Sequence, residues 1–389
     1  MKDLRQELEQ RQQQGLYRRR KILQSPQGRE ITIDGQQVLN FCSNDYLGLA
    51  NHPQVKQSFI KAAQEYGVGS GSAHLVNGHT QLHHQLEEEL ADFCGYPRAL
   101  LFSTGYMANL AVAQSLCGRK DTIIEDKLNH ASLLDAAQLS GGKLKRYLHV
   151  DYSSLQSLLQ NTVKHSPAGD NREILVSSDA VFSMDGDEAD IKTMAQACEQ
   201  HDAWLMLDDA HGIGVLGDHG KGSLSHQSIN PGNVSVYMAT LGKAMGTAGA
   251  FVAGSEELIE YLIQTARSYI YTTAMPAAVA AATLSSLNIL RTSNDSQHAL
   301  HSNIDYFKHL AQQQNLKLMP SNTAIQPILV GNSELALKLS QQLFNKGLHV
   351  AAIRPPTVPK NTARLRITLR ADHTESDIQH LVNTLSELL

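Results

Sequence analysis

The feature that most constrains the fold is a series of short, nearly continuous apolar runs separated by amphipathic helical segments. These runs occupy residues 99–102, 173–178, 203–207, 234–239 and 249–254. Runs of this kind are typical of strands that are buried on both faces, as in parallel sheets covered by crossover helices. One intervening segment places four apolar side chains on a single helical stripe, namely Leu82, Leu86, Leu90 and Phe93. The alternation predicts an α/β fold with a mainly parallel central sheet and flanking helices.

The length of 389 residues suits more than one domain, at roughly 100–200 residues each. Residues 1–38 are predicted to form an N-terminal arm that ends in a hairpin turning at Asp34-Gly35. Residues 39–285 are expected to form the large α/β domain. The segment 286–389 is predicted to be a smaller α+β domain, with strands at 324–331, 349–356 and 362–369 and a last helix that starts at a capping box of Thr374 and Asp377.

Composition excludes several classes of protein. The formal net charge of −5 comes without a basic field, so no nucleic-acid partner is expected. The polar N-terminus has no apolar core of a secretory signal, and no apolar run approaches the ~20 residues of a membrane span. The four cysteines show no CxxC spacing and are expected to be reduced thiols. We therefore expect a cytoplasmic protein that does not associate with membranes.

Chemically competent side chains follow three of the apolar runs. The run at 203–207 leads into Asp208 and His211, the run at 234–239 leads into Lys243, and the run at 99–102 leads into Thr104-Gly105-Tyr106 at a helix start. In open α/β sheets, ligands bind beyond the carboxyl ends of the strands. Taken singly, each feature has an ordinary structural explanation: a helix cap, a solvated charge or a turn.

Taken together, these residues match the requirements of pyridoxal 5′-phosphate (PLP). This cofactor needs a lysine amine for its aldehyde, which Lys243 could supply. It also needs an acid against its pyridine nitrogen, for which Asp208 is the candidate. The backbone N–H groups at the helix start after Thr104 could bind its phosphate. The combination favours a PLP enzyme.

At these residues the sequence resembles the α-oxoamine synthases, a family of fold-type I PLP-dependent enzymes. The resemblance covers nearly the whole chain, and the order and spacing of its motifs are highly specific. The motifs are SNDYLGLA, GSGSAHLVNGHTQLHHQLEEEL, NHASLLDA, VFSMDGDEADI, LDDAHGIGVLGDHGKG, TLGKAMG, YIYTTAMP, IRPPTVP and TARLRITL.

The resemblance implies a role for each matching residue around the cofactor. Lys243 is implied to carry the cofactor, Asp208 to pair with the pyridine nitrogen and His211 to bond the phenolic oxygen. His130 is implied to stack on the ring. The remaining cofactor contacts are implied at Thr104, Gly105, Tyr106, Ser183 and Thr240, and at Thr272 or Thr273 toward the phosphate of a partner subunit in a homodimer.

For the substrates, the resemblance implies that Arg366 holds the carboxylate of the amino acid, which a guanidinium fork suits. The other substrate contacts are implied at Arg18, Asn44, His130 and Thr357. Three positions depart from the commoner family pattern. Asp179 stands in place of glutamate, Thr104 in place of serine and His74 in place of arginine.

The IRPPTVP and SNTAIQP segments resemble the branch of the family that works in biotin biosynthesis. This branch implies decarboxylative condensation of L-alanine with a pimeloyl thioester, delivered by coenzyme A or by an acyl carrier protein. Several alternatives remain open: the glycine-using siblings 2-amino-3-ketobutyrate CoA ligase and 5-aminolevulinate synthase, serine palmitoyltransferase, an aminotransferase on the same fold, and a non-catalytic partner subunit. The presence of Lys243 argues against the last of these.

Overall fold

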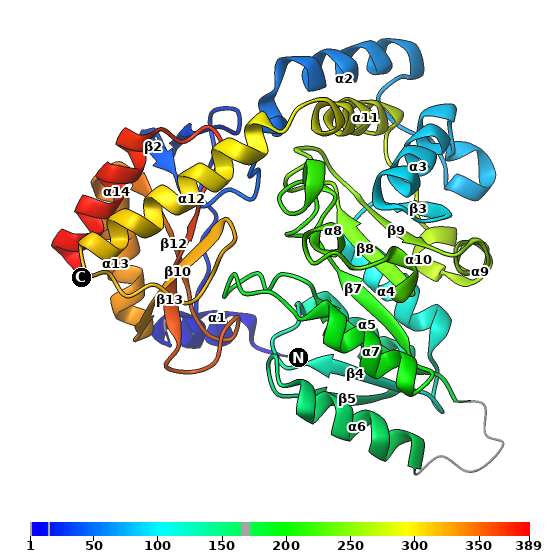
Figure 1. Cartoon of the computed structure of the whole chain (residues 1–389). Helices are drawn as coiled ribbons and strands as arrows, with labels where there is room; N and C mark the ends of the chain where they lie inside the picture. The colour runs from blue at the N-terminus through cyan, green and yellow to red at the C-terminus, as the bar shows by residue number, and fades with distance from the viewer. Residues whose placement is uncertain (1, 15, 165–171) are drawn as a thin grey trace. The chain divides into compact units, whose positions relative to one another are not determined.

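The structure is a computed structural model that describes residues 2–14, 16–164 and 172–389 (Figure 1). Contacts between residues divide the chain into two compact units. The larger unit comprises His52–Ser183 and Glu188–Gln297, and the smaller one comprises Met1–Asn51, Met184–Asp187 and His298–Leu389. The limits at residues 38 and 285 that the sequence suggests for the arm and the domains stay predictions.

A seven-stranded sheet forms the centre of the larger unit, with the strand order β3-β9-β8-β7-β6-β4-β5. β9 is antiparallel to both of its neighbours, whereas the pairs among β8, β7, β6, β4 and β5 are parallel. All five predicted apolar runs are strands of this sheet, which confirms the mainly parallel α/β fold. The strands are β3 (Arg98–Phe102), β4 (Thr122–Asp126), β5 (Lys143–Tyr147), β6 (Ile174–Asp179), β7 (Trp204–Asp208), β8 (Val236–Thr240) and β9 (Ala250–Gly254).

Helices flank this sheet (Figure 1). The predicted stripe on α3 is confirmed, since Leu86, Leu90 and Phe93 are buried and Leu82 is half-buried. Gly95 ends α3 in the left-handed conformation that glycine adopts readily. The helices are α2 (Pro53–Tyr66), α3 (Gln81–Cys94), α4 (Gly105–Leu116), α5 (Ala131–Ser140), α6 (Tyr152–Lys164), α7 (Ile191–Gln200), α8 (Ser223–His226), α9 (Glu256–Thr265), α10 (Arg267–Ile270) and α11 (Ala277–Thr292).

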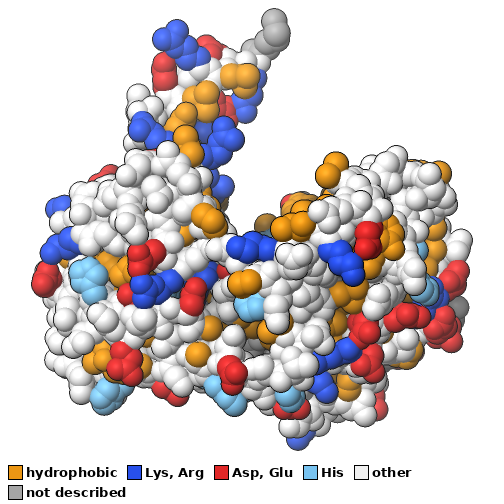
Figure 2. Space-filling view, turned by 90° about the horizontal axis from the view of Figure 1, so that it is seen from above, with side chains coloured by type: hydrophobic (Ala, Val, Ile, Leu, Met, Phe, Trp, Pro, Cys, Tyr) orange, Lys and Arg blue, Asp and Glu red, His pale blue; other side chains and the backbone are white. Residues whose placement is uncertain are grey.

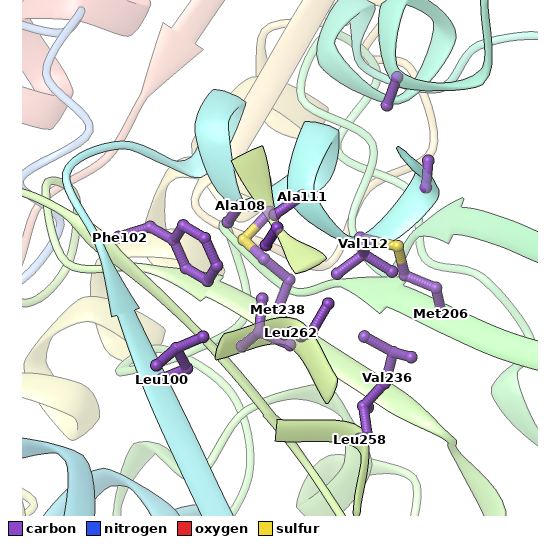
Figure 3. Close-up of a cluster of buried hydrophobic side chains, with 14 of the residues drawn as sticks. Leu100, Phe102, Ala108, Ala111, Val112, Met206, Val236, Met238, Leu258 and Leu262 are labelled. Carbon is purple, nitrogen blue, oxygen red and sulfur yellow. The ribbon is translucent and has the colours of Figure 1, made fainter. Parts of the chain in front are cut away.

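An apolar core anchors α4 on the sheet (Figure 3). Ala108 and Val112 of α4 belong to one buried cluster with Phe102 of β3, Met238 of β8 and Leu262 of α9. Close-packed side chains of this kind resist displacement, because even small changes of core volume are costly. The core therefore fixes the N-terminus of α4 at the edge of the sheet where β3 ends.

The smaller unit has an α+β architecture, as predicted. β1 (Glu30–Ile33) and β2 (Gln36–Asn40) form the expected hairpin, and its turn residues Asp34 and Gly35 both have positive φ. The predicted capping box at the start of α14 is also confirmed, because Thr374 and Asp377 each accept a backbone N–H of the other. The other elements are α1 (Leu4–Gln13), α12 (Asp295–Gln313, which starts in the larger unit), β10 (Ile325–Gly331), α13 (Ser333–Asn345), β11 (Leu348–His349), β12 (Ala351–Ile353), β13 (Ala363–Thr368) and α14 (Glu375–Leu388).

The surface carries charges of both signs. On the face shown in Figure 2, basic and acidic side chains are interspersed. Among the described residues, no helix has the length and apolar character needed to cross a membrane. The four cysteines are free thiols, and Cys94, Cys117 and Cys198 are buried, as the sequence predicts.

A buried histidine in the smaller unit makes its stability sensitive to acid. His373 accepts the backbone N–H of Arg370 at 3.2 Å, and its Nε2 bonds the backbone oxygen of Asn40 at 3.1 Å. Burial lowers the pKa of His373 to about 4. Because the unfolded chain binds this proton more tightly, the free energy of unfolding falls as the pH drops below the unfolded pKa of about 6.5.

We expect His373→Gln to flatten this acid dependence. Between pH 7 and pH 5 the native protein should lose about 2 kcal/mol of stability through this one side chain. Urea unfolding at both pH values measures the loss, with His380→Gln at an exposed position of α14 as the matched control. The expectation is wrong if His373→Gln and the native chain lose the same stability over this range.

Candidate active site

Polar side chains gather where the parallel strands of the larger unit end. Asp179 is the last residue of β6 and lies directly opposite Asp208, the last residue of β7. Asp208 in turn lies opposite Met238 of β8, two residues before Thr240. The carboxyl ends of three adjacent strands thus present their side chains at one edge of the sheet, where α/β proteins bind ligands.

A cavity of about 190 Å³ opens at this edge. It brings together eight of the residues predicted from the sequence: Gly105, Tyr106, His130, Ser183, Asp208, His211, Thr240 and Lys243. Five further residues line it: Ser132, Asp179, Val181, Ala210 and Met238. Residues separated by well over a hundred positions in the sequence therefore share one site.

Lys243 lies in the tight connection between β8 and β9. The backbone N–H of Gly246 bonds the oxygen of Lys243 at 2.8 Å, and the N–H of Leu241 bonds the oxygen of Gly249 at 2.9 Å. Gly249 has a φ of +101°, and a Cβ there would lie 3.0 Å from the backbone oxygen of Phe102, so this position favours glycine. The lysine amine lies 2.9 Å from Nε2 of His211.

Asp208 is buried and held by two hydrogen bonds. Its Oδ1 accepts the backbone N–H of Ala210 at 3.1 Å, and its Oδ2 accepts Nδ2 of Asn109 at 2.9 Å. Nδ2 of Asn109 also donates to Oγ of Ser132 at 2.8 Å. Both amide hydrogens of this buried asparagine are therefore used, and each oxygen of the carboxyl group of Asp208 accepts a hydrogen bond.

His130 is the N-cap of α5 and is fixed on two sides. Its backbone N–H donates to Asp179 at 3.0 Å, and its Nδ1 lies 2.7 Å from Oγ of Ser132. Burial lowers the pKa of His130, which keeps the planar ring neutral. Burial raises the pKa of Asp179 well above its usual value, and the nearby carboxyl group of Asp208 raises it further. The shorter carboxyl side chain at position 179 thus still reaches the turn that carries His130.

The N-terminus of α4 forms one wall of the cavity. Oγ1 of Thr104 caps the helix by accepting the N–H of Met107 at 3.2 Å. The N–H groups of Gly105 and Tyr106 belong to the first turn, where helices have no intrahelical partner for their donors. The hydroxyl of Tyr106 donates to Asp135. This helix end suits an anionic group such as a phosphate.

Asp209, the neighbour of Asp208, has a structural role instead. It accepts the N–H of Ser223 at 2.8 Å, the hydroxyl of Ser223 at 2.6 Å and the hydroxyl of Tyr237 at 2.7 Å. Burial raises the pKa of Asp209 to about 6. A Cβ on Gly212 would meet Asp209 at 2.0 Å, so only glycine fits there. These contacts hold the turn that carries His211.

The remaining predicted residues lie outside this cavity. In the smaller unit, NH2 of Arg366 donates to Oδ1 of Asn44 at 3.2 Å and NH1 donates to Thr368 at 3.0 Å, so two predicted substrate residues are in contact. Arg18 and Thr357 are exposed in the same unit. Thr272 is half-buried and Thr273 is exposed in the larger unit, where Thr273 accepts a bond from Ser103 at 3.3 Å.

Sequence reasoning missed Asn109 and Ser132, which connect Asp208 to His130. One signal was present, because Asn109 is a polar side chain in the otherwise apolar start of a helix, MANLAVA. A buried amide of this kind needs hydrogen-bonding partners. Its partners lie on other elements, and only the folded chain identifies them.

The donor set of the cavity fits PLP. A lysine amine, a buried carboxylate, a neutral planar imidazole and a helix N-terminus line one space. These are the groups that the aldehyde, the pyridine nitrogen, the ring face and the phosphate of this cofactor require.

Comparisons with known proteins agree with this arrangement. The model of the family "Aminotransferase class I and II" matches residues 36–385. The 8-amino-7-oxononanoate synthase of Thioalkalivibrio sulfidiphilus is 54% identical over 99% of this chain and 97% of its own. The crystal structure of 8-amino-7-oxononanoate synthase from Francisella tularensis has a TM-score of 0.77 at 34% identity, covering 90% of this chain and 97% of that one.

A serine palmitoyltransferase from S. paucimobilis, solved with PLP and myriocin bound, has a TM-score of 0.91 at 28% identity and covers 99% of this chain and 96% of its own. The fold-type I prediction and the PLP prediction are thereby confirmed. The chain belongs to the 8-amino-7-oxononanoate synthases, a PLP-dependent family on the fold of class I and II aminotransferases.

Proposed function

We propose that this chain condenses L-alanine with a pimeloyl thioester to give 8-amino-7-oxononanoate, CO2 and a free thiol carrier. The observation that carries the proposal is the cavity in which Lys243 and Asp208 meet, in a chain that is 54% identical to a protein named for this product. The remaining residue roles follow from what lines the cavity and what surrounds Arg366.

PLP, when bound, supplies an electron sink for negative charge on the α-carbon of the amino acid. With the cofactor in this cavity, the carboxylate of Asp208 would accept a hydrogen bond from the pyridine nitrogen and hold a proton on that atom. His130 would cover the ring face, His211 would face the phenolic oxygen, and the N–H groups of Gly105 and Tyr106 would bind the phosphate. Ser183 and Thr240 would supply the remaining contacts.

Lys243 is the general base of the reaction. Its amine removes the α-proton of alanine, and for this step the amine must be uncharged. Nε2 of His211, which lies 2.9 Å from the amine, can share the proton that Lys243 takes up. The α-carbon then bonds the thioester carbonyl carbon, and the C–S bond breaks with release of thiolate. Loss of the carboxyl group as CO2 leaves the electron pair on the α-carbon, which Lys243 reprotonates.

Arg366 is proposed to hold the carboxylate of the amino acid. The guanidinium is buried and already oriented by Asn44 and Thr368, so its fork is fixed before substrate arrives. Arg18 and Thr357 are proposed as contacts of the acyl substrate. In the same unit, Arg354 donates to the backbone oxygen of Tyr17 at 3.0 Å, which ties the residue beside Arg18 to the segment that holds Thr357.

We expect Arg366→Lys to raise the KM for L-alanine by about tenfold or more, because a lysine keeps the charge but loses the two-pronged bond to a carboxylate. Steady-state kinetics at saturating thioester measure the change. Arg291→Lys, which alters a surface ion pair with Asp92, serves as the matched control. An unchanged KM for L-alanine would show that the carboxylate is bound elsewhere.

Three further properties belong to the proposal. The enzyme is a homodimer in which Thr272 or Thr273 reaches the phosphate held by the partner subunit. It works in the cytoplasm. Its N-terminal arm ends near residue 38, and the boundary between its two domains lies near residue 285. Light scattering of the purified protein tests the dimer. Loss of PLP affinity in the Thr272→Ala/Thr273→Ala double variant tests the shared site.

The test of the function is product analysis with PLP-loaded protein. With L-alanine and pimeloyl-CoA we expect equal amounts of thiol and CO2 and a product with the mass of 8-amino-7-oxononanoate. Turnover of glycine with a short acyl thioester, and none with pimeloyl-CoA, would move the chain to a sibling activity. An exchanged keto acid without thiol release would make it an aminotransferase, and both results contradict the proposal.

A further inference from the structure

A second group of chemically competent side chains lies in the larger unit, at the start of α3. Among the residues that the structure describes, His79, His84 and Glu87 each offer one ligand atom, and these atoms lie within 4.8 Å of one another. They line a hollow of about 810 Å³. Two of them, His84 and Glu87, belong to α3, which Figure 1 labels. None of the three lines the cavity that contains Lys243.

We propose that His79, His84 and Glu87 form a binding site for a first-row divalent cation such as Zn²⁺. Two imidazoles and one carboxylate are a frequent set of protein ligands for such ions, with the remaining positions taken by water. Solvent can fill these positions here, because the hollow is large and the side chain of His84 is 65% exposed.

The distance between two of the ligand atoms suits this assignment. Nε2 of His79 lies 3.9 Å from Oε2 of Glu87. Two ligands that each bind a zinc ion at about 2.1 Å lie no more than about 4.2 Å apart, so this pair can bind one ion without backbone movement. His84 and Glu87 are three positions apart on α3, a spacing that places both side chains on the same face of the helix.

The second side of two of the ligands, His79 and Glu87, is already held. Nδ1 of His79 lies 2.9 Å from Nδ1 of His74, so one of these two nitrogens must carry the hydrogen. With the hydrogen on His79, its Nε2 has the free electron pair that a metal requires, and His74 orients the ring as residues around metal ligands commonly do. Oε1 of Glu87 accepts the N–H of Leu101 at 2.9 Å, which leaves Oε2 facing His79.

The neighbouring groups do not replace the cation. Arg98 lies in the same hollow, but its guanidinium pairs with Glu256 at 2.7 Å and with Glu260 at 3.2 Å. His83 is not a ligand, since its Nδ1 accepts the N–H of Thr80 and its Nε2 donates to the oxygen of Met275.

Bound metal would join the segment before α3 to the first two turns of the helix. A ligand that binds only the folded chain stabilises it by an amount that grows with the logarithm of the free ligand concentration above Kd, so the melting temperature should rise with the concentration of free metal. The site is separate from the residues proposed for catalysis. Its test is therefore independent of the proposed function.

The experiment is calorimetric titration of the PLP-loaded protein with Zn²⁺, and absorbance between 500 and 650 nm, roughly the range of ligand-field bands, with Co²⁺ in its place. Three variants are compared with the native chain. His84→Ala changes an exposed ring, Glu87→Gln keeps the bond to Leu101 while it removes the charge, and His298→Ala is the control on an exposed face of α12.

We expect one high-affinity ion per chain, an affinity lowered at least about tenfold by His84→Ala and by Glu87→Gln, and an unchanged affinity in His298→Ala. The rise in melting temperature with Zn²⁺ should disappear in the same two variants. Absence of binding, or equal binding by all four proteins, would refute the site. Circular dichroism checks that each variant is folded. His84→Ala is the decisive variant, because the side chain of His84 is exposed and its loss should not disturb the fold.

Discussion

Lys243→Ala should lower turnover of L-alanine and pimeloyl-CoA by about 10³-fold or more, because one substitution removes both the covalent attachment of the cofactor and the general base. The fold should survive the change. Lys243 is half-buried, and the loop around it is held by backbone bonds that an alanine keeps, such as the bond from Gly246 to the oxygen of residue 243.

Two measurements besides turnover make this result specific. Reduction with borohydride followed by mass spectrometry should add the mass of the cofactor to the native chain and add nothing to Lys243→Ala. Thermal melting should show the variant folded, and Lys192→Ala on the exposed side of α7 should behave like the native chain in every measurement. Covalent trapping of the cofactor in Lys243→Ala would place the attachment at another lysine.

The sequence predicted those parts of the site that depend on local rules. Asp208 and Lys243 follow strands that their apolar runs reveal, and the carboxyl ends of parallel strands must meet at one edge. Gly105 and Tyr106 line the cavity at the predicted helix start, whereas Thr104, predicted as a cofactor contact, caps α4 and does not line the cavity. For these residues, knowledge of the strand order was unnecessary.

Other parts of the site depend on long-range packing that no local pattern encodes. The contact between Asn109 and Asp208 joins α4 to the end of β7, ninety-nine residues later in the chain. The antiparallel direction of β9 was also hidden, because its apolar run reads like those of its parallel neighbours. Both features follow from how the core of the larger unit packs. The periodicity of apolar residues in the sequence indicates which side chains are buried, but it does not indicate which other elements they contact.

Asp208→Asn should produce the second large effect, a loss of kcat of about 10²–10³-fold, since it removes a preorganised charge from the reacting system. The amide has nearly the shape of the carboxylate, and its oxygen can still accept the N–H of Ala210 or the amide of Asn109. We therefore expect the variant to fold normally. A weaker affinity for PLP, measured by equilibrium dialysis, should accompany the loss of turnover.

Asn109→Leu tests whether Asp208 acts alone or needs its neighbour. The substitution keeps the size of the side chain but removes the bonds to Asp208 and Ser132. A hydrogen bond to a charged group contributes about 1.5–3 kcal/mol, so kcat/KM should fall by roughly 10- to 100-fold. Asn345→Ala, at an exposed helix end, is the control. Asn109 has no direct contact with substrate in this proposal, so its effect should pass through Asp208 or, by way of Ser132, through His130.

The double variant Asn109→Leu/Asp208→Asn shows whether Asn109 acts by orienting the charge of Asp208. If Asn109 orients the charge of Asp208, its removal should cost little once that charge is gone, and the two losses should not add. The PLP affinity should follow the same pattern as kcat/KM. Additive losses would mean instead that Asn109 acts independently of the charge of Asp208, through packing or through its bond to Ser132, because such an asparagine would matter equally beside an aspartate or an asparagine at position 208.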